Sequence, residues 1–215
     1  MRERFRGELR RLGGLLAGMS ATAGRQLSLA TESLLRNDLG VSDRVLAEDA
    51  GLDRNRDRCV ADAQRLLALQ APVAGDLRAV LAAVYCAERI ERMGDLARHV
   101  AEMSRRAHPL SAVPLSLHSS FAELGRMGVR MADAVTVLIG GEDGSAAFDR
   151  MVADDDRVRA AHRRLMGQVV DPRWPYGVAV AVNVALLGRF YGRFADQAVS
   201  VARRLEFAVT GTLPR

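Results

Sequence analysis

Four acidic side chains lie within one uninterrupted stretch of the sequence, residues 86–106. They are Glu88, Glu91, Asp95 and Glu102, and no proline interrupts the residues between them. At about 100° per residue in an α-helix, the four carboxylates fall within roughly 60° of one another. Glu91 and Asp95, four residues apart, form the kind of paired oxygen ligand that binds hard metal cations. The strip is therefore a candidate metal site.

The same strip has a second explanation, because arginines are interleaved with its acids. Arg92 and Arg98 lie within reach of the carboxylates, and His99 follows Asp95 by four residues. Like charges four residues apart repel one another, so either a cation or these arginines must offset the repulsion. A solvated face of arginine–carboxylate pairs explains the residues without any metal. This stretch alone leaves both interpretations open.

Other kinds of site chemistry find little support in the sequence. Di-iron centres in helical bundles use Glu-x-x-His pairs, and none of the four histidines has an acid three residues before it. The two cysteines, Cys59 and Cys86, lack CxxC spacing, and their expected role is core packing. Gly140 and Gly141 do not belong to a Walker pattern. We therefore expect that the protein is not an enzyme.

Composition favours a helical protein of the cytoplasm. Only 5% of the 215 residues are aromatic while 49% are hydrophobic, so the core must consist of Leu, Val, Ala and Met, as in closely packed helices. The net charge is +5, and every basic residue is an arginine. No arginine-rich patch is interleaved with aromatic residues, so nucleic-acid binding is not expected. The N-terminus lacks the apolar core of a signal peptide, and no run approaches the length of a membrane span.

Hydrophobic periodicity predicts long helices and no strand. The expected helices cover about residues 4–36, 42–70, 76–108, 117–139, 145–169 and 178–209. Ser42 is the expected N-cap of the second helix, and Asp76 that of the third, after a break at Pro72. A looser segment, residues 110–117, is the best candidate for a domain boundary.

The two halves of the chain repeat one pattern of helix, turn, helix, proline break and helix. Asp95 aligns with Asp196 in similar surroundings, and the segments 47–49 and 153–155 also match. A repeat of this kind indicates a duplicated structural unit. The predicted fold is all-α, with two tandem antiparallel three-helix bundles. The first bundle spans residues 1–109 and the second spans residues 115–215.

These residues resemble the PhoU family, the accessory regulators of bacterial high-affinity phosphate transport. The segment Glu91-Arg-Met-Gly-Asp95, followed by Val100-Ala-Glu102, looks like the family's ERxGD…IAE signature. Three further segments resemble the family, namely Pro72–Arg78, Arg193–Val199 and Val209–Gly211. The similarity covers essentially the whole chain in the same order.

The resemblance implies a cytosolic regulator of phosphate uptake and phosphate-starvation signalling. Its implied partners are a sensor histidine kinase, which it would negatively regulate, and the ATPase or permease of a phosphate ABC transporter. Such a protein would be peripheral to the membrane through these partners, and a homodimer is a further expectation. The alternative is a helical structural or oligomerising adaptor with no role in phosphate signalling, which would share the fold and the basic charge.

The resemblance also gives the metal hypothesis a ligand set. Family members carry metal clusters held by E(D)xxxD pairs on facing helices, and here these would be Asp49 with Asp53 and Glu91 with Asp95. Two such pairs supply four hard oxygen ligands. Iron, manganese, magnesium and calcium suit this set, and zinc is the fifth candidate although no thiolate is present.

The second half departs from that ligand set. Gly192 stands at the position that matches Glu91, and Arg159 falls near the position that matches Asp53. These replacements remove two carboxylates and add a positive charge that repels a cation. We therefore expect any metal ion in the first bundle only.

Overall fold

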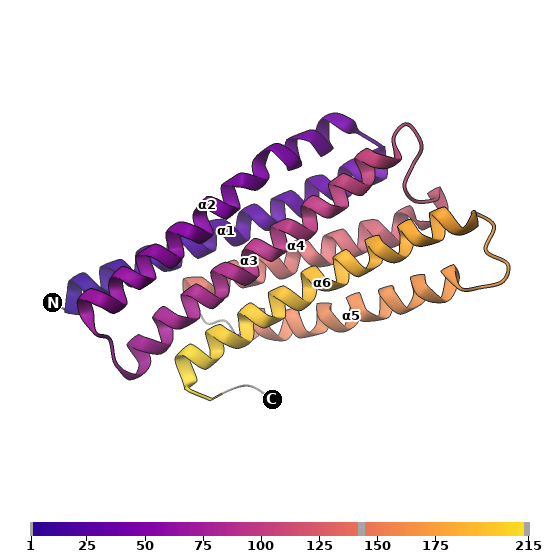
Figure 1. Ribbon diagram of the computed structural model, residues 1–215. Helices are drawn as coiled ribbons and strands as arrows, with labels where there is room; N and C mark the ends of the chain where they lie inside the picture. The colour runs from indigo at the N-terminus through magenta and orange to yellow at the C-terminus, as the bar shows by residue number, and fades with distance from the viewer. Residues whose placement is uncertain (1, 142–144, 213–215) are drawn as a thin grey trace.

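The computed structural model describes residues 2–141 and 145–212, and within this part it contains helices and no strand (Figure 1). The side chains of Arg2, Asp49 and Ser145 are outside the description. The helices are α1 (Arg2–Arg36), α2 (Leu39–Gln70), α3 (Ala74–Ala107), α4 (His118–Gly140), α5 (Ser145–Val169) and α6 (Gly177–Thr210), with a 3-10 turn, η1 (Leu115–Leu117), before α4. The all-α prediction is confirmed.

The turn between α1 and α2 is shorter than predicted, and its cap is a different residue. Asp38 is the N-cap of α2, and its Oδ1 accepts a hydrogen bond from the Val41 amide at 3.1 Å. Ser42 lies inside the helix, buried, with its Oγ 2.9 Å from the Oγ of Ser33. Ser33 also contacts Ser104 of α3 through hydroxyl oxygens 2.9 Å apart. The prediction of Ser42 as the cap was wrong because this hydroxyl belongs to a buried serine cluster.

The start of α3 also differs from the prediction. Its N-cap is Val73, which has no side-chain capping bond, and Asp76 lies in the first turn instead. A carboxylate in the first turn still stabilises a helix through the macrodipole. Asp76 therefore contributes charge there and does not cap the helix.

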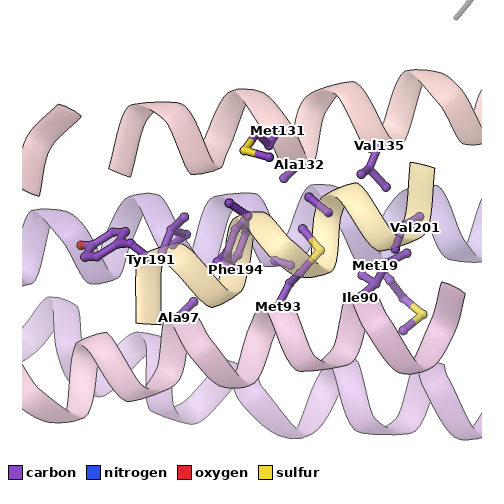
Figure 2. Close-up of a cluster of buried hydrophobic side chains, with 14 of the residues drawn as sticks. Met19, Ile90, Met93, Ala97, Met131, Ala132, Val135, Tyr191, Phe194 and Val201 are labelled. Atoms are coloured by element: carbon purple, nitrogen blue, oxygen red, sulfur yellow. The ribbon is translucent and has the colours of Figure 1, made fainter. Parts of the chain in front are cut away.

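The six long helices pack as two triplets that share one interior. In the first half α1, α2 and α3 pack against one another, and in the second half α4, α5 and α6 do so. The halves meet where α1 packs on α4 and α3 packs on α6 (Figure 1). Buried side chains from α1, α3, α4 and α6 form one cluster, which includes Met19, Met93, Met131 and Phe194 (Figure 2). The equivalence of the predicted bundles, 1–109 and 115–215, remains a prediction.

Two buried polar contacts tie the halves together. The hydroxyl oxygens of Thr31 on α1 and Tyr191 on α6 lie 2.9 Å apart. The hydroxyl of Ser20 on α1 donates to the carbonyl oxygen of Ala132 on α4 at 2.9 Å. Burying a polar group without a hydrogen-bond partner costs free energy, so these contacts favour the observed packing of one triplet on the other.

Helix α6 is more apolar than was predicted. By length and composition it could cross a membrane, and 33% of its most apolar window is buried. Val184, Leu187 and Phe194 of this helix belong to the shared core. A core helix of a bundle meets the same criterion, so this is weak support for a membrane span. Its first turns nevertheless leave Val178 and Val182 exposed.

Candidate functional site

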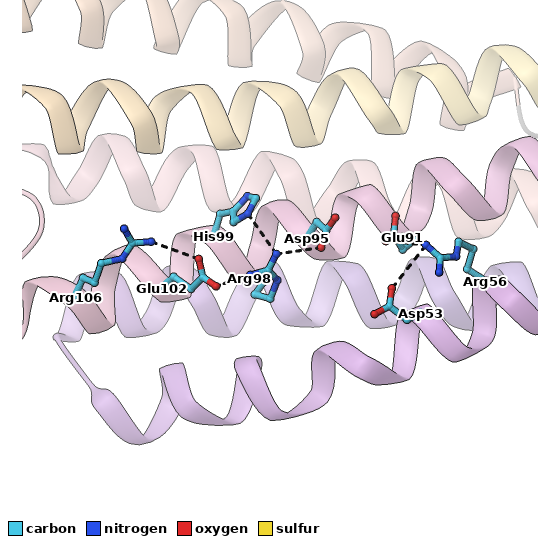
Figure 3. Close-up of polar contacts among 8 residues, drawn as sticks. All are labelled: Asp53, Arg56, Glu91, Asp95, Arg98, His99, Glu102 and Arg106. Atoms are coloured by element: carbon cyan, nitrogen blue, oxygen red, sulfur yellow. Dashed lines mark hydrogen bonds and ion pairs between the residues drawn. The ribbon is translucent and has the colours of Figure 1, made fainter.

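The predicted carboxylates of the first half lie on the facing helices α2 and α3 (Figure 3). Asp53 belongs to α2, while Glu91 and Asp95 are one turn apart on α3. Arg56, one turn after Asp53, reaches across so that its Nη1 is 3.2 Å from Oε1 of Glu91. The same nitrogen lies 3.9 Å from Oδ1 of Asp53. A guanidinium therefore occupies the space between the facing acids.

Glu91 has the most unusual electrostatic surroundings of this strip. Its side chain is only 13% exposed. The pKa of Glu91 is raised to about 7, mainly by burial and also by the neighbouring carboxylates of Asp95 and Asp53, while the guanidinium of Arg56 acts in the opposite direction. A buried carboxyl near other acids favours its neutral form. Glu91 thus changes charge near neutral pH.

The next turns of α3 continue the same alternation of acids and arginines (Figure 3). Arg98 forms ion pairs with Asp95, at 3.4 Å, and with Glu102. Glu102 also lies 3.5 Å from a guanidinium nitrogen of Arg106. His99 Nε2 is 3.4 Å from Nη2 of Arg98. This geometry matches the interpretation of the strip as a face of arginine–carboxylate pairs.

The described side chains of the predicted metal site lie beside arginines. The side chain of Asp49 lies outside the described residues. Among the side chains that are described, no three or more His, Cys, Asp or Glu residues form a group suited to a metal ion. Asp53, Glu91 and Asp95 have Arg56 or Arg98 as their neighbours. These side chains are not arranged as a ligand set, and the metal centre remains a prediction.

In the second half a buried acid is paired with an arginine across two helices. Asp154 of α5 has a side chain only 7% exposed. Arg130 of α4 donates to both of its oxygens, from Nε at 2.9 Å and from Nη2 at 2.8 Å. Arg157 lies one turn further along α5, 3.4 Å from Oδ1. This bidentate geometry is the strong form of an arginine–carboxylate contact.

Arg159 links α5 to α6 where the first half has facing acids. Its Nε donates to Asp155 at 2.9 Å, and its Nη2 donates to Asp196 at 3.4 Å. Arg193 contacts the second oxygen of Asp196 at 3.5 Å. Gly192 contributes no side chain at the position that matches Glu91. The charge of these acids is balanced by arginine, and the absence of a metal from this half remains a prediction.

Two arginines make contacts between helices that were not predicted, Arg56 with Glu91 and Arg130 with Asp154. Arg56 follows Asp53 by three residues, which is the spacing of a contact along one helix. That spacing predicts that Arg56 balances the acids of its own helix, but it does not indicate the contact with Glu91 on α3. Arg130 and Asp154 are 24 residues apart on different helices, so no local spacing could have paired them.

The chain matches a known domain and several full-length relatives. Residues 16–104 match the PhoU domain. The chain is 41% identical over 214 residues to the phosphate-specific transport system accessory protein PhoU homolog 1 of Mycobacterium leprae, covering 100% of this chain and 96% of that protein. It is also 41% identical to PhoU homolog 2 of Mycobacterium tuberculosis, with 100% of both chains covered. The chain belongs to the PhoU family.

Solved structures show the same fold. The crystal structure of PhoU from Pseudomonas aeruginosa has a TM-score of 0.84 at 21% sequence identity, and it covers 97% of this chain and 100% of that one. The phosphate transport system regulatory protein PhoU from Streptococcus pneumoniae also has a TM-score of 0.84, at 20% identity, with 98% and 99% covered. The resemblance drawn from the signature around Glu91 and Asp95 is confirmed. Both residues lie within the matched domain.

Proposed function

We propose that this protein is an accessory regulator of phosphate transport that acts by contact with other proteins. Full-length identity of 41% to proteins named phosphate-specific transport system accessory proteins carries the proposal. Its partners are the ATPase or permease of a phosphate ABC transporter and a sensor histidine kinase, whose signalling it restrains when phosphate is plentiful. It works in the cytoplasm and reaches the membrane through these partners.

The chemistry of the described side chains supports a role without catalysis. Burial raises the pKa of Cys59 to about 11 and that of Cys86 to about 12, so neither thiol is an activated nucleophile. Asp154 and Asp155 are held by Arg130 and Arg159. Acids neutralised in this way are poor general bases.

Exposed apolar side chains supply a surface for protein contact. Leu77 and Leu81 lie at the start of α3, and Val178 and Val182 lie at the start of α6. The spacing of four residues places each pair on one helix face. Exposed apolar surface of this kind is typical of contact sites between proteins. We call these residues the apolar helix starts. They form two patches at opposite ends of the molecule, because the start of α3 lies beside the end of α6, where Arg78 donates to the carbonyl oxygen of Ala208 (Figure 1), and both patches are the contact surfaces that we propose.

A deletion strain complemented with variants tests the regulator. Deleting the gene derepresses phosphate-starvation genes in medium rich in phosphate, and the wild-type chain restores repression. We expect Leu81→Asp with Val182→Asp to fail, because a charge on the apolar helix starts opposes burial against a partner. A transcriptional reporter measures the response, and circular dichroism checks that the variant is folded.

The control changes two leucines that are even more exposed, Leu110→Asp with Leu115→Asp, both in the segment between α3 and α4. It should repress like the wild type.

Recovery of a transporter ATPase or a sensor kinase by affinity purification separates this function from that of a structural adaptor. An unchanged starvation response after deletion would contradict the regulator.

The homodimer belongs to the same proposal. Light scattering of the purified full chain measures the mass directly, and twice the 23.3 kDa of the chain is the expected result. A monomer at micromolar concentration would contradict it.

A further inference from the structure

A pocket rich in arginine lies between α5 and α6 of the second half. Its volume is about 430 Å³. Four arginines, a histidine and one acid line it, namely Arg159, Arg163, Arg189, Arg193, His162 and Asp196. We call it the arginine pocket. By the predicted duplication of the two halves, it corresponds to the place of the strip of facing acids in the first half.

The positive charge of this pocket is only partly balanced. Arg159 is paired with Asp155 and Asp196, and Arg193 is paired with Asp196. Arg163 and Arg189 have no ion-pair partner in residues 2–141 and 145–212. Four guanidinium groups thus face two carboxylates. The surplus is positive whatever the state of His162.

Glycine on α6 keeps the pocket open. A Cβ placed on Gly192 would meet no atom within 4 Å, so the space beside it is free. One turn earlier, a Cβ on Gly188 would come 3.2 Å from the ring of His162, which therefore packs close to the α6 backbone. In the first half Glu91 stands at the position that matches Gly192, and its carboxylate accepts a hydrogen bond from Arg56. Gly192 and Glu91 thus give the two halves different surroundings at this position.

The ion pairs of the pocket also hold two of its arginines in place. Asp155 binds Arg159 through Nε at 2.9 Å, and Asp196 receives contacts from both Arg159 and Arg193. A guanidinium that is already oriented loses less freedom when it binds an anion. Its remaining N–H groups form a planar fork that matches the oxygens of a phosphate group.

We propose that the arginine pocket binds a multiply charged phosphate oxyanion. Its volume falls within the range of small-molecule sites, about 300–1,000 Å³, and exceeds what one tetrahedral ion requires. Apart from His162, no ring lines it, so base stacking, which single-stranded nucleic acids use, has no platform there. The ligand is therefore a small anion with one or more phosphoryl groups. The site adds to the proposed regulator and does not depend on that proposal.

Calorimetric titration of the full chain with pyrophosphate, and separately with orthophosphate, tests the site. Sodium chloride keeps the ionic strength constant, since contacts to exposed arginines weaken with salt. We expect saturable binding of one anion per chain, with pyrophosphate the tighter of the two. Arg163→Gln with Arg189→Gln should weaken it by about tenfold or more, because two positively charged hydrogen-bond donors are lost.

Two further variants distinguish binding in the pocket from nonspecific attraction to the positive charge of the protein. Gly192→Glu fills the open space with a carboxylate, as at Glu91, and should also abolish binding. Arg44→Gln with Arg203→Gln removes two exposed arginines outside the pocket and should leave binding unchanged. Circular dichroism checks the fold of each variant.

Titration with ATP distinguishes the sources of the phosphate group. Binding as tight as that of pyrophosphate assigns the site to a nucleotide's phosphate chain, and binding of the inorganic probes alone assigns it to a free anion. The proposal is overturned if no probe binds saturably, or if binding survives both Gly192→Glu and the paired change of Arg163 and Arg189.

Discussion

At the scale of single residues, Glu91 shows how one environment supports two opposite interpretations. It lies between acids on two helices, and that arrangement made it a candidate metal ligand. In the structure it is nearly buried, it contacts Arg56 at 3.2 Å, and its pKa is raised to about 7. The negative charge of the Glu91 carboxylate can therefore be removed by a bound proton, or balanced by an arginine or by a metal cation. Two predictions separate these possibilities.

The first prediction is that Glu91 makes the stability of the metal-free protein depend on pH. The pKa of its carboxyl group rises from 4.5 to about 7 on folding. The proton is therefore bound more tightly in the folded state, and its stabilising contribution is complete below about pH 4.5 and lost as the pH rises to about 7. The free energy of unfolding of Glu91→Gln relative to wild type should rise by about 1–3 kcal/mol between pH 4.5 and 8.

Urea unfolding at several pH values, with a chelator present, measures this difference. Glu88→Gln, an exposed change on the same helix, is the matched control and should follow the wild type at every pH. Parallel pH profiles for the wild type and Glu91→Gln would show that the carboxyl group titrates normally.

The second prediction concerns metal content. If Asp49, Asp53, Glu91 and Asp95 hold a metal, protein purified in metal-replete buffer contains iron, manganese, magnesium, calcium or zinc. Glu91→Ala with Asp95→Ala should then lose it, because two of four oxygen ligands are gone. Elemental analysis by mass spectrometry gives the answer.

Asp155→Ala in the second half is the control for this experiment and should keep the wild-type content. The metal hypothesis is contradicted if the metal content is unchanged in the Glu91 and Asp95 variant. It is also contradicted if metal is absent from both the wild type and the variant. In that case arginines such as Arg56, Arg98 and Arg106 balance the strip.

At the scale of the elements, small residues set how closely the helices pack. Gly94 of α3 faces α2, and a Cβ there would come 2.3 Å from Cδ1 of Leu52. Gly128 of α4 faces α1, where a Cβ would come 2.4 Å from Cδ2 of Leu27. Both leucines are 1% exposed, so neither can swing aside without disturbing the core.

The third prediction follows from this packing. Gly94→Ala should lower the free energy of unfolding by about 1–3 kcal/mol, since overpacking outweighs the better helix propensity of alanine. Gly14→Ala is the matched control, because nothing lies within 4 Å of its added Cβ. It should be neutral or stabilise the protein by up to about 1 kcal/mol. Thermal and denaturant unfolding measure both, and a stabilised Gly94→Ala would contradict the close packing.

At the scale of the whole molecule, the described part of the chain has one shared core. The cluster that contains Met93, Met131 and Phe194 draws on helices from both triplets (Figure 2). The buried contact between Thr31 and Tyr191 crosses the same boundary. Separating the halves would expose these side chains to water, at about 25 cal/mol for each Å² of apolar surface.

The fourth prediction is that the two halves unfold together. Scanning calorimetry of the full chain should give a single transition whose calorimetric and van't Hoff enthalpies agree. A fragment of residues 1–109 should be markedly less stable and should bind a hydrophobic dye, because the apolar faces of α1 and α3 lose their cover. Two resolved transitions, or a fragment as stable as the full chain, would show independent bundles.

The sequence by itself determined the elements and the family. Apolar residues at helical spacing predicted all six long helices, and the segment around Glu91 and Asp95, together with three further segments in the same order, indicated PhoU. The predicted N-cap of α2 was wrong, because the choice between Asp38 and Ser42 as the cap depends on the buried serine cluster that Ser33 and Ser104 complete.

Only the tertiary structure decided which charges meet. The pairing of Arg130 with Asp154 and the reach of Arg56 to Glu91 depend on how neighbouring helices are rotated and staggered. Spacing along one helix says which residues share a face, but it does not say what that face meets. The arginine pocket is of the same kind, since its arginines come from α5 and α6 and its opening depends on Gly192. Local periodicity therefore predicted the helices, and packing between helices created the sites.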